Sequence, residues 1–297
     1  MRAFEYREYG PPEVLQLIEA PMPTPNDNEV LVKIHAAAVN PLDCHSMRGR
    51  PLFLRLMNGG LRKPKEVRIG ADMAGEVEAV GESVTAFKPG DSVFGACSGA
   101  LAEYACAAQD RLALKPENIS YEEAAAVPVA AITALQGLRD KGQIQPGQQI
   151  AVDGASGGVG TFAVQIAKAL GADVTAICST RNAERAQSIG AGEVIDYTQE
   201  DFTRHRKGYD LIFAANAYHS IFDYGRALNP NGIYVMAGGG GTQILQAIFV
   251  GPLLSLMGSK KFKFFVANIN KRDLGVLRDL LADEKIVPII DRRYGLS

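Results

Sequence analysis

Several features that would place a protein in a specialised class are missing from this sequence. The four cysteines are scattered and never stand at the C-x-x-C spacing of metal or redox sites, which indicates a reducing compartment. The formal net charge of -2 gives no electrostatic reason to expect nucleic acid or an anionic membrane surface as a partner. The N-terminal residues alternate like a strand and lack the apolar segment of a signal peptide, so we expect a cytoplasmic protein.

Internal repeats and low-complexity tracts are also missing, and the composition is that of a soluble globular protein with one or two cores. Apolar patterns predict a β-rich barrel in the first part of the chain, with strands at 29–40, 71–81 and 89–96. Ser120, followed by Glu122 and Glu123, predicts a capped start for one helical segment over 120–142. A helix from residue 271 is predicted to lead into a strand over Val287–Ile290.

A glycine-rich turn follows a short apolar run in AVDGASGGVGTFAVQIAKAL, residues 151–170. Apolar residues then recur at helical spacing, at Phe162, Ile166 and Leu170, so the turn is predicted to join a strand to a helix. It matches G-x-G-x-x-G with alanine in the first place, and backbone amides at such a helix N-terminus bind anions. We predict that the turn holds the pyrophosphate of a dinucleotide, at Ser156, Gly157, Gly158 and Val159.

Strands and helical patterns alternate after this turn. Four further strands are predicted, over Val174–Cys178, around Val194 and Ile195, over Tyr209–Ala214 and over Ile233–Ala237. Such alternation predicts a parallel, doubly wound sheet whose ligand lies at the carboxyl ends of the strands. The residues after the fourth and fifth strands are therefore expected on the nicotinamide side, at Ala215, Asn216, Ala237 and Gly238.

The end of the second predicted strand lacks the acidic residue that binds the ribose 2′-hydroxyl of NAD. The place is occupied instead by hydroxyl, guanidinium and amide side chains, at Ser179, Thr180, Arg181 and Asn182. Arg181 offers the planar donor group that suits a phosphate, so NADP(H) is the predicted cofactor. The alternative is that Arg181 only begins a solvated helix.

Six motifs along the chain are AAAVNPLDCHSMRG, GADMAGEVEAVGESVTAFKPGDSVFG, AEYACA, EEAAAVPVAAITALQGL, ASGGVG and CSTRNAERAQSIGAGEVIDY. They occur in the same order in the medium-chain dehydrogenase/reductase superfamily, which the chain resembles over essentially its whole length. Within the superfamily the chain resembles the zinc-free quinone oxidoreductase and enone reductase branch, which includes a chloroplast-envelope homologue. The resemblance implies an α/β protein with a Rossmann-like doubly wound parallel sheet inserted in a GroES-like β-barrel catalytic domain.

The resemblance also implies domain boundaries. Residues 1–120 are expected to form the first part of the GroES-like catalytic domain, and 121–270 the Rossmann-like NADP-binding domain. Residues 271–297 are expected to return to the catalytic domain. Members of the family usually continue further, so this return is expected to be truncated.

Zinc-dependent members of the superfamily use a cysteine near position 44 and the histidine of a G-H-E motif. Here that motif reads Gly70-Ala71-Asp72, which removes the imidazole ligand, and the cysteine cluster of the structural zinc lobe is missing. A catalytic zinc needs three protein ligands, so we predict no metal site. Cys44 is expected to pack under the active cleft, and His45 to be exposed on a turn.

The resemblance implies hydride transfer from NADPH to a small apolar quinone or α,β-unsaturated carbonyl, with no metal required. It places Asn40 near the nicotinamide, where its side chain can assist catalysis by hydrogen bonding. The alternative for Asn40 is a turn residue before Pro41. The resemblance also places Thr133 near the nicotinamide ribose and Tyr197 beside the 2′-phosphate, although Tyr197 could be only a strand-end aromatic residue.

The apolar stretch over 242–262 is too short and too interrupted for a membrane span. Its basic end could lie on a membrane surface, but we expect the stretch to cover a hydrophobic substrate cleft or to form a homodimer contact. The alternative function is a non-catalytic NADPH-binding protein, like the crystallins and membrane-associated proteins of the same superfamily.

Overall fold

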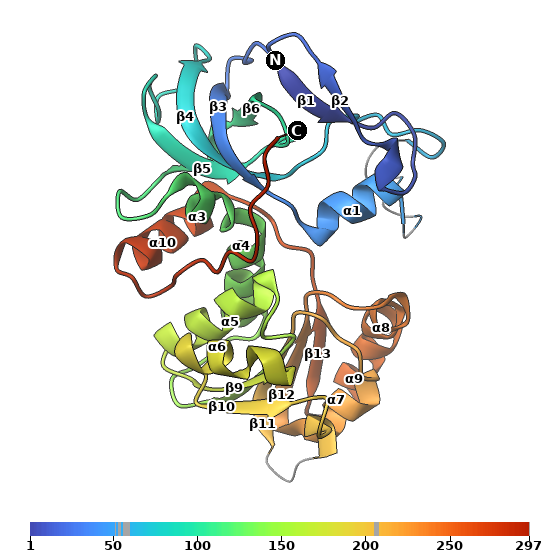
Figure 1. Cartoon of the computed structure of the whole chain (residues 1–297). Coiled ribbons are helices and arrows are strands. Elements are labelled where there is room, and N and C mark those ends of the chain that lie inside the picture. The colour runs from blue at the N-terminus through green and yellow to red at the C-terminus, as the bar shows by residue number, and fades with distance from the viewer. Residues whose placement is uncertain (51, 53–54, 56–59, 205–207, 297) are drawn as a thin grey trace. The chain divides into compact units, whose positions relative to one another are not determined.

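The fold is known from a computed structural model that describes residues 1–50, 52, 55, 60–204 and 208–296. The chain forms two compact units (Figure 1). The first comprises Met1–Val129, Ile269–Ala282 and Pro288–Ser297. The second comprises Ala130–Asn268 and Asp283–Val287. Each unit therefore contains more than one segment of the chain.

An antiparallel sheet forms the framework of the first unit, with the strand order β6-β3-β4-β5-β7. The strands are β3 (Glu29–Ala38), β4 (Asp72–Val80), β5 (Ser92–Ala96), β6 (Tyr104–Ala108) and β7 (Leu112–Leu114). A separate antiparallel pair consists of β1 (Arg2–Glu5) and β2 (Gln16–Glu19). Alternate side chains of the sheet, among them Val30, Val32, Met73 and Val77, are buried in one core, as a sheet with one covered face requires. The predicted strands at 29–40, 71–81 and 89–96 are thus present.

Three helices of the first unit have sequence signals at their ends. They are α1 (Pro41–Arg48), α3 (Tyr121–Ala125) and α10 (Lys271–Ala282). The predicted cap at Ser120 is confirmed, because its hydroxyl accepts from the amide of Glu123 and the Glu123 carboxylate accepts from the amide of Ser120. Helix α1 ends at Gly49, whose φ of 57° lies in the left-handed region that favours glycine.

Two secondary-structure predictions are wrong. The helical segment over 120–142 is divided into α3, α4 (Pro128–Gln136) and a π-helical turn (Gly137–Lys141), because Pro128 lacks an amide hydrogen for a continuous helix. The predicted strand over Val287–Ile290 has no regular structure. The amide of Val287 donates to the Gln165 side chain at 2.7 Å, so it is used by a side chain instead of a neighbouring strand.

The second unit contains a six-stranded parallel sheet with the order β10-β9-β8-β11-β12-β13. Its strands are β8 (Gln149–Asp153), β9 (Asp173–Cys178), β10 (Glu193–Asp196), β11 (Tyr209–Ala214), β12 (Leu228–Met236) and β13 (Lys261–Phe264). The five predicted strands are present, and β13 adds a sixth that was not predicted. Strands β9 and β10 are added on one side of β8, and β11, β12 and β13 on the other. The strand order therefore reverses between β8 and β11, which is where parallel sheets of this type bind ligands.

The helices of the second unit are α5 (Gly158–Ala169), α6 (Ala183–Ser188), α7 (Ile221–Ala227), α8 (Gly241–Leu245) and α9 (Gly251–Met257). The helix predicted from Phe162, Ile166 and Leu170 is present as α5; Phe162 and Ile166 are buried, and Leu170 caps the helix end and is exposed. A π-helical turn (Gln246–Val250) joins α8 to α9. Within the described residues, no helix combines the length and hydrophobicity needed to cross a membrane.

Candidate functional site

The turn after β8 depends on two glycines that come very close to other backbone atoms. Gly154 has a φ of 78°, and a Cβ there would lie 3.1 Å from Asn216. A Cβ on Gly160 would lie 2.0 Å from the carbonyl oxygen of Gly154. Gly154 therefore makes the tight turn that the motif assigns to its first glycine, one position before Ala155, and Gly160 permits the close packing of α5 on β8.

The other two glycines of the turn face open space. A Cβ on Gly157 would have its nearest neighbour at 3.6 Å, and one on Gly158 at 3.9 Å. Both residues are exposed at the start of α5. The first-turn amides of this helix, which include those of Gly158 and Val159, have no acceptor within the helix. A phosphate group fits this surface because it can approach the backbone closely and accept from these amides.

The residues predicted on the nicotinamide side lie together at the carboxyl edge of the sheet. The amide of Ala215 donates to the carbonyl of Asp153 at 2.9 Å, and the amide of Ala237 donates to that of Ala214 at 2.9 Å. A Cβ on Gly238 would lie 2.5 Å from the carbonyl oxygen of Ala215. With Asn216 against Gly154, these residues form a continuous edge beside the turn.

A buried carboxyl group behind this edge was not predicted. Asp153, the last residue of β8, accepts from the Tyr224 hydroxyl at 2.5 Å, and its Oδ1 has no hydrogen-bond partner among the described residues. Burial raises the pKa of Asp153 to about 7, with the hydrogen bond from Tyr224 acting in the opposite direction. Burial also raises the pKa of Tyr224. The sequence signal was an acidic residue in an otherwise apolar strand.

The predicted 2′-phosphate residues follow β9, and an acid from the next strand lies among them. The Thr180 hydroxyl donates to Asp196, the last residue of β10. Asn182 donates to the Ser179 hydroxyl at 3.1 Å. Arg181 is exposed and forms no ion pair with a residue that the structure describes. The guanidinium is therefore available to a ligand, whereas the hydroxyl of Thr180 is already used.

Two tyrosines meet near the same edge of the sheet. Tyr197 follows β10 and Tyr218 follows β11, and their ring centroids are 5.8 Å apart. Both rings are partly exposed, with 48% and 43% of each residue accessible. Tyr197 therefore has an aromatic neighbour that was not predicted, because the two residues come from different strand-to-helix connections.

In the first unit, Asn40 is held by two carboxylates. Its backbone amide donates to Asp43 at 2.7 Å, and its Nδ2 donates to Asp72 at 3.0 Å. Asp72 also accepts from the amide of Val129, with both oxygens at 3.1 Å. Asn40 precedes Pro41 as the N-cap residue of α1, so the structural alternative considered from the sequence describes its backbone role correctly.

Burial affects both carboxyl groups beside Asn40. It raises the pKa of Asp43 to about 6 and that of Asp72 to about 8, while the hydrogen bonds that they accept act in the opposite direction. Asp43 was predictable as the third residue of a helix that begins after an asparagine. The contact of Asp72 was not, because it depends on pairing between β3 and β4.

The remaining sequence candidates occupy separate places. Thr133 is half-buried on α4 in the second unit, whereas Asn40 belongs to the first. Cys44 is exposed on α1, so the prediction that it packs under a cleft is wrong. His45 is exposed as expected, but on this helix instead of a turn. Across the described ranges, His, Cys, Asp and Glu side chains form no group of three that could hold a metal ion.

Comparison with known proteins identifies the family. The model of the alcohol dehydrogenase GroES-like domain matches residues 26–117, and that of the zinc-binding dehydrogenase family matches residues 158–279. The chloroplast envelope quinone oxidoreductase homolog of Arabidopsis thaliana is 35% identical, over 100% of this chain and 92% of that protein. The chain belongs to the medium-chain dehydrogenase/reductase superfamily. The predicted resemblance and fold class, a GroES-like domain with a Rossmann-like parallel sheet, are confirmed.

Other members of this superfamily share the fold and differ in the substrates they are named for. The 2-methylene-furan-3-one reductase of Solanum lycopersicum is 34% identical, over 100% of this chain and 73% of that protein. The structure of Escherichia coli quinone oxidoreductase in complex with NADPH superposes with a TM-score of 0.80 at 27% identity, over 96% of this chain and 89% of that one. These relatives are thus named as quinone oxidoreductases and as a reductase of 2-methylene-furan-3-one.

Proposed function

We propose that this protein is an NADPH-dependent reductase of quinones or α,β-unsaturated carbonyl compounds and that it acts without zinc. The observation that carries the proposal is the turn over 154–160, which presents unsatisfied amides and two open glycines at the carboxyl edge of a parallel sheet. The relatives named for quinone and enone reduction support the reaction class. In this account the second unit binds the cofactor, and the first supplies the catalytic domain.

The residues of the second unit have distinct roles in the proposal. Ser156, Gly157, Gly158 and Val159 contact the pyrophosphate. The amides of Ser156, Gly158 and Val159 donate to it, whereas the amide of Gly157 donates to the carbonyl of Gly154 at 3.1 Å and its missing side chain lets the phosphate approach. Arg181 forms an ion pair with the 2′-phosphate, because its guanidinium has no competing carboxylate among the described residues. Asp196 holds the Thr180 hydroxyl, so we assign discrimination between NADPH and NADH mainly to Arg181.

The chemistry of the reaction belongs to the cofactor, which when bound supplies a hydride equivalent. The chain's own groups bind and orient. Asn40 is the candidate hydrogen-bonding group, and it is held at its backbone by Asp43 and at its side chain by Asp72. Ala71 stands where zinc-dependent relatives carry a histidine, so the residues available fit an acceptor that needs no Lewis acid. An apolar quinone or enone meets this condition.

Steady-state oxidation of NADPH tests the proposal. We expect turnover with a small enone or a quinone and little turnover with saturated aldehydes of similar size. Exhaustive chelation is expected to leave the rate unchanged. Tight NADPH binding without turnover of any enone or quinone would support the non-catalytic alternative, and loss of activity together with stoichiometric zinc would contradict the metal-free assignment.

A further inference from the structure

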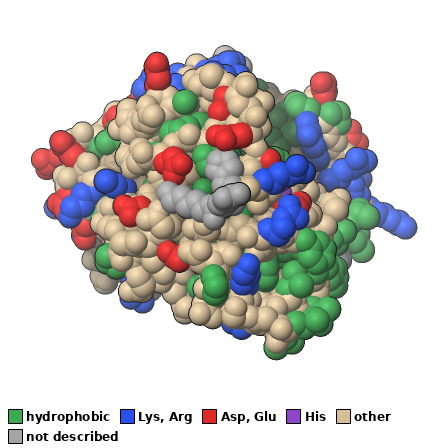
Figure 2. Space-filling view, turned by 90° about the horizontal axis from the view of Figure 1, so that it is seen from below, with side chains coloured by type: hydrophobic (Ala, Val, Ile, Leu, Met, Phe, Trp, Pro, Cys, Tyr) green, Lys and Arg blue, Asp and Glu red, His purple; other side chains and the backbone are tan. Residues whose placement is uncertain are grey.

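The surface formed by α8, the π-helical turn and α9 carries more exposed apolar side chains than folding of the unit requires. We call it the α8–α9 face, and it consists of Leu245, Ile248, Phe249, Leu253, Leu256 and Met257. Phe249, Leu256 and Met257 are 72%, 86% and 77% exposed. Figure 2 shows hydrophobic side chains gathered at the lower right of its view, with Lys and Arg side chains beside them.

The same helices already have an apolar side that packs inward. Ala247 is buried in the core of the second unit, and Ile244, Val250 and Leu254 pack against that core. The helices are thus anchored without the α8–α9 face. Exposed apolar area of this extent, gathered on consecutive turns, is typical of a surface that meets another apolar partner.

The segment that carries the α8–α9 face contains basic side chains and no acidic ones. Asp and Glu are missing from the sequence between Asp223 and Asp273, whereas Lys260, Lys261 and Lys263 follow α9 directly. Asp223 itself is engaged by the Arg226 guanidinium at 2.6 Å. The whole-chain net charge of -2 conceals this local segregation of charge.

The three lysines are bound to carbonyl oxygens and leave their positive charge unpaired. Their Nζ atoms donate to the carbonyls of Gly225 at 2.6 Å, Ser255 at 2.8 Å and Lys141 at 2.8 Å. None of them forms an ion pair with a residue in the described part of the chain. Lys263 alternates along β13 with Phe262, which is buried in the core under α8 and α9, so the Lys263 side chain lies on the opposite face of the sheet, beside Lys141. The α8–α9 face therefore combines apolar side chains with two cations, Lys260 and Lys261, that form no ion pair within the described residues.

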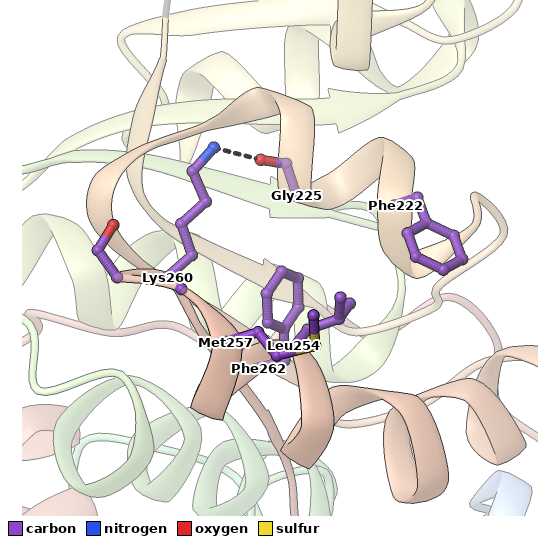
Figure 3. Close-up of a pocket in the computed structure, with 8 residues that line it drawn as sticks. Phe222, Gly225, Leu254, Met257, Lys260 and Phe262 are labelled. Carbon is purple, nitrogen blue, oxygen red and sulfur yellow. Dashed lines mark hydrogen bonds between the residues drawn. The ribbon is translucent and has the colours of Figure 1, made fainter.

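A hollow of about 380 Å³ continues the face between α7, α9 and β13. Figure 3 shows Phe222, Leu254, Met257 and Phe262 around it, with the Lys260 stem along one side and its dashed hydrogen bond to Gly225. The hollow has apolar walls and a cationic rim. This arrangement suits a molecule with an apolar chain and an anionic head.

We propose that the α8–α9 face docks on a lipid surface that carries anionic headgroups. Phe249, Leu256 and Met257 enter the boundary between headgroups and acyl chains, and Lys260 and Lys261 lie among the headgroups. A second copy of the chain fits less well, because two-fold pairing of this face brings unpaired lysines together without carboxylates. The proposal is independent of the reductase activity.

Co-sedimentation of the whole chain with vesicles tests the proposal. We expect binding to vesicles of phosphatidylcholine mixed with phosphatidylglycerol and about tenfold weaker binding to phosphatidylcholine alone. Raised salt is expected to weaken the binding to the anionic vesicles. Lys261→Gln is expected to weaken it by about fivefold, whereas Lys88→Gln, an exposed lysine of the first unit, is expected to leave it unchanged.

The apolar contribution is tested with Phe249→Glu combined with Leu256→Glu, and the matched control is Met22→Glu, an exposed methionine of the first unit. We expect the double variant to lose vesicle binding and the control to keep it, with both retaining the wild-type unfolding midpoint. Absence of wild-type binding, or equal binding by the double variant, would overturn the proposal. The proposal would also be overturned if light scattering showed a dimer for the wild type and a monomer for the double variant, with equal vesicle binding by both proteins.

Discussion

The two units build their candidate binding groups in opposite ways. In the second unit the groups are backbone amides of consecutive residues, exposed by glycines that carry no side chain. In the first unit Asn40 is fixed by buried carboxyl groups, one of which, Asp72, lies on another strand. A backbone site depends on the absence of Cβ atoms, whereas a side-chain site depends on the presence of particular acceptors. Adding a methyl group to a glycine tests the backbone site, and removing an acceptor such as Asp72 tests the side-chain site.

Asp72→Ala is expected to cause the largest loss of stability. The substitution removes the carboxyl group that accepts from the buried Asn40 Nδ2 and from the amide of Val129. We expect the free energy of unfolding to fall by about 4 kcal/mol in urea denaturation, since each buried unsatisfied donor costs about 1–3 kcal/mol. Asp72→Asn, which retains one acceptor oxygen, is expected to lose less. Equal losses for the two variants would show that hydrogen bonding to Asp72 is not what stabilises this region.

Gly160→Ala tests the backbone site. The new methyl group would lie 2.0 Å from the Gly154 carbonyl oxygen, so we expect unfolding to become easier by about 3 kcal/mol. Gly158→Ala is the matched control, because its methyl group has no neighbour closer than 3.9 Å. This control is expected to keep its stability and to weaken NADPH binding in titration calorimetry. A stable Gly160→Ala protein would contradict the close packing of α5 on β8.

Arg181→Ala tests the cofactor preference. We expect NADPH binding to weaken by about 2 kcal/mol, as for the loss of a hydrogen bond to a charged group, with NADH binding nearly unchanged. Lys168→Ala is the control, because this exposed lysine lies at the opposite end of α5 from the turn. Fluorescence titration with both dinucleotides measures the difference. Equal weakening for NADPH and NADH would reject the assignment of Arg181 to the 2′-phosphate.

Asp153 gives an effect that is spread over several pH units. Its pKa is raised to about 7 in the folded protein, so between about pH 4 and pH 7 the folded state binds more protons than the unfolded state. The contribution of Asp153 to stability is therefore full at low pH and is lost as pH rises through 7. Relative to Asp153→Asn, the wild type is expected to lose up to about 1.4 kcal/mol per pH unit across this window. Parallel stability curves for the two proteins would show that Asp153 does not titrate in this way.

Local signals explain why much of the second unit was predictable. The central strands could be recognised because they contain short apolar runs buried on both faces, as parallel sheets require. The edge strand β10 is only partly buried and was recognised from Val194 and Ile195. The turn was recognised because its glycines are contiguous. The sixth strand, β13, was missed because its residues, Lys261–Phe264, alternate basic and aromatic side chains at the edge of the sheet.

Groups that depend on distant pairing could not be predicted. Asp72 meets Asn40 only because β3 and β4 pair in one register, and Asp196 meets Thr180 only because β10 lies beside β9. The exposure of Cys44 follows from the phase of α1, in which Asp43 and Met47 are the buried residues. The helix has only eight residues, so its apolar residues do not repeat often enough for the sequence to show which side of the helix is buried.

The position of hydride transfer tests the central claim most directly. The protein is incubated with deuterium-labelled NADPH and one small enone, and the label in the product is located by NMR. We predict deuterium at the β-carbon of a saturated ketone, because the chain offers Asn40 as a hydrogen-bonding group and its described residues contain no group of His, Cys, Asp and Glu side chains that could hold a zinc ion to polarise a carbonyl. Deuterium at the carbonyl carbon of an allylic alcohol would contradict the account.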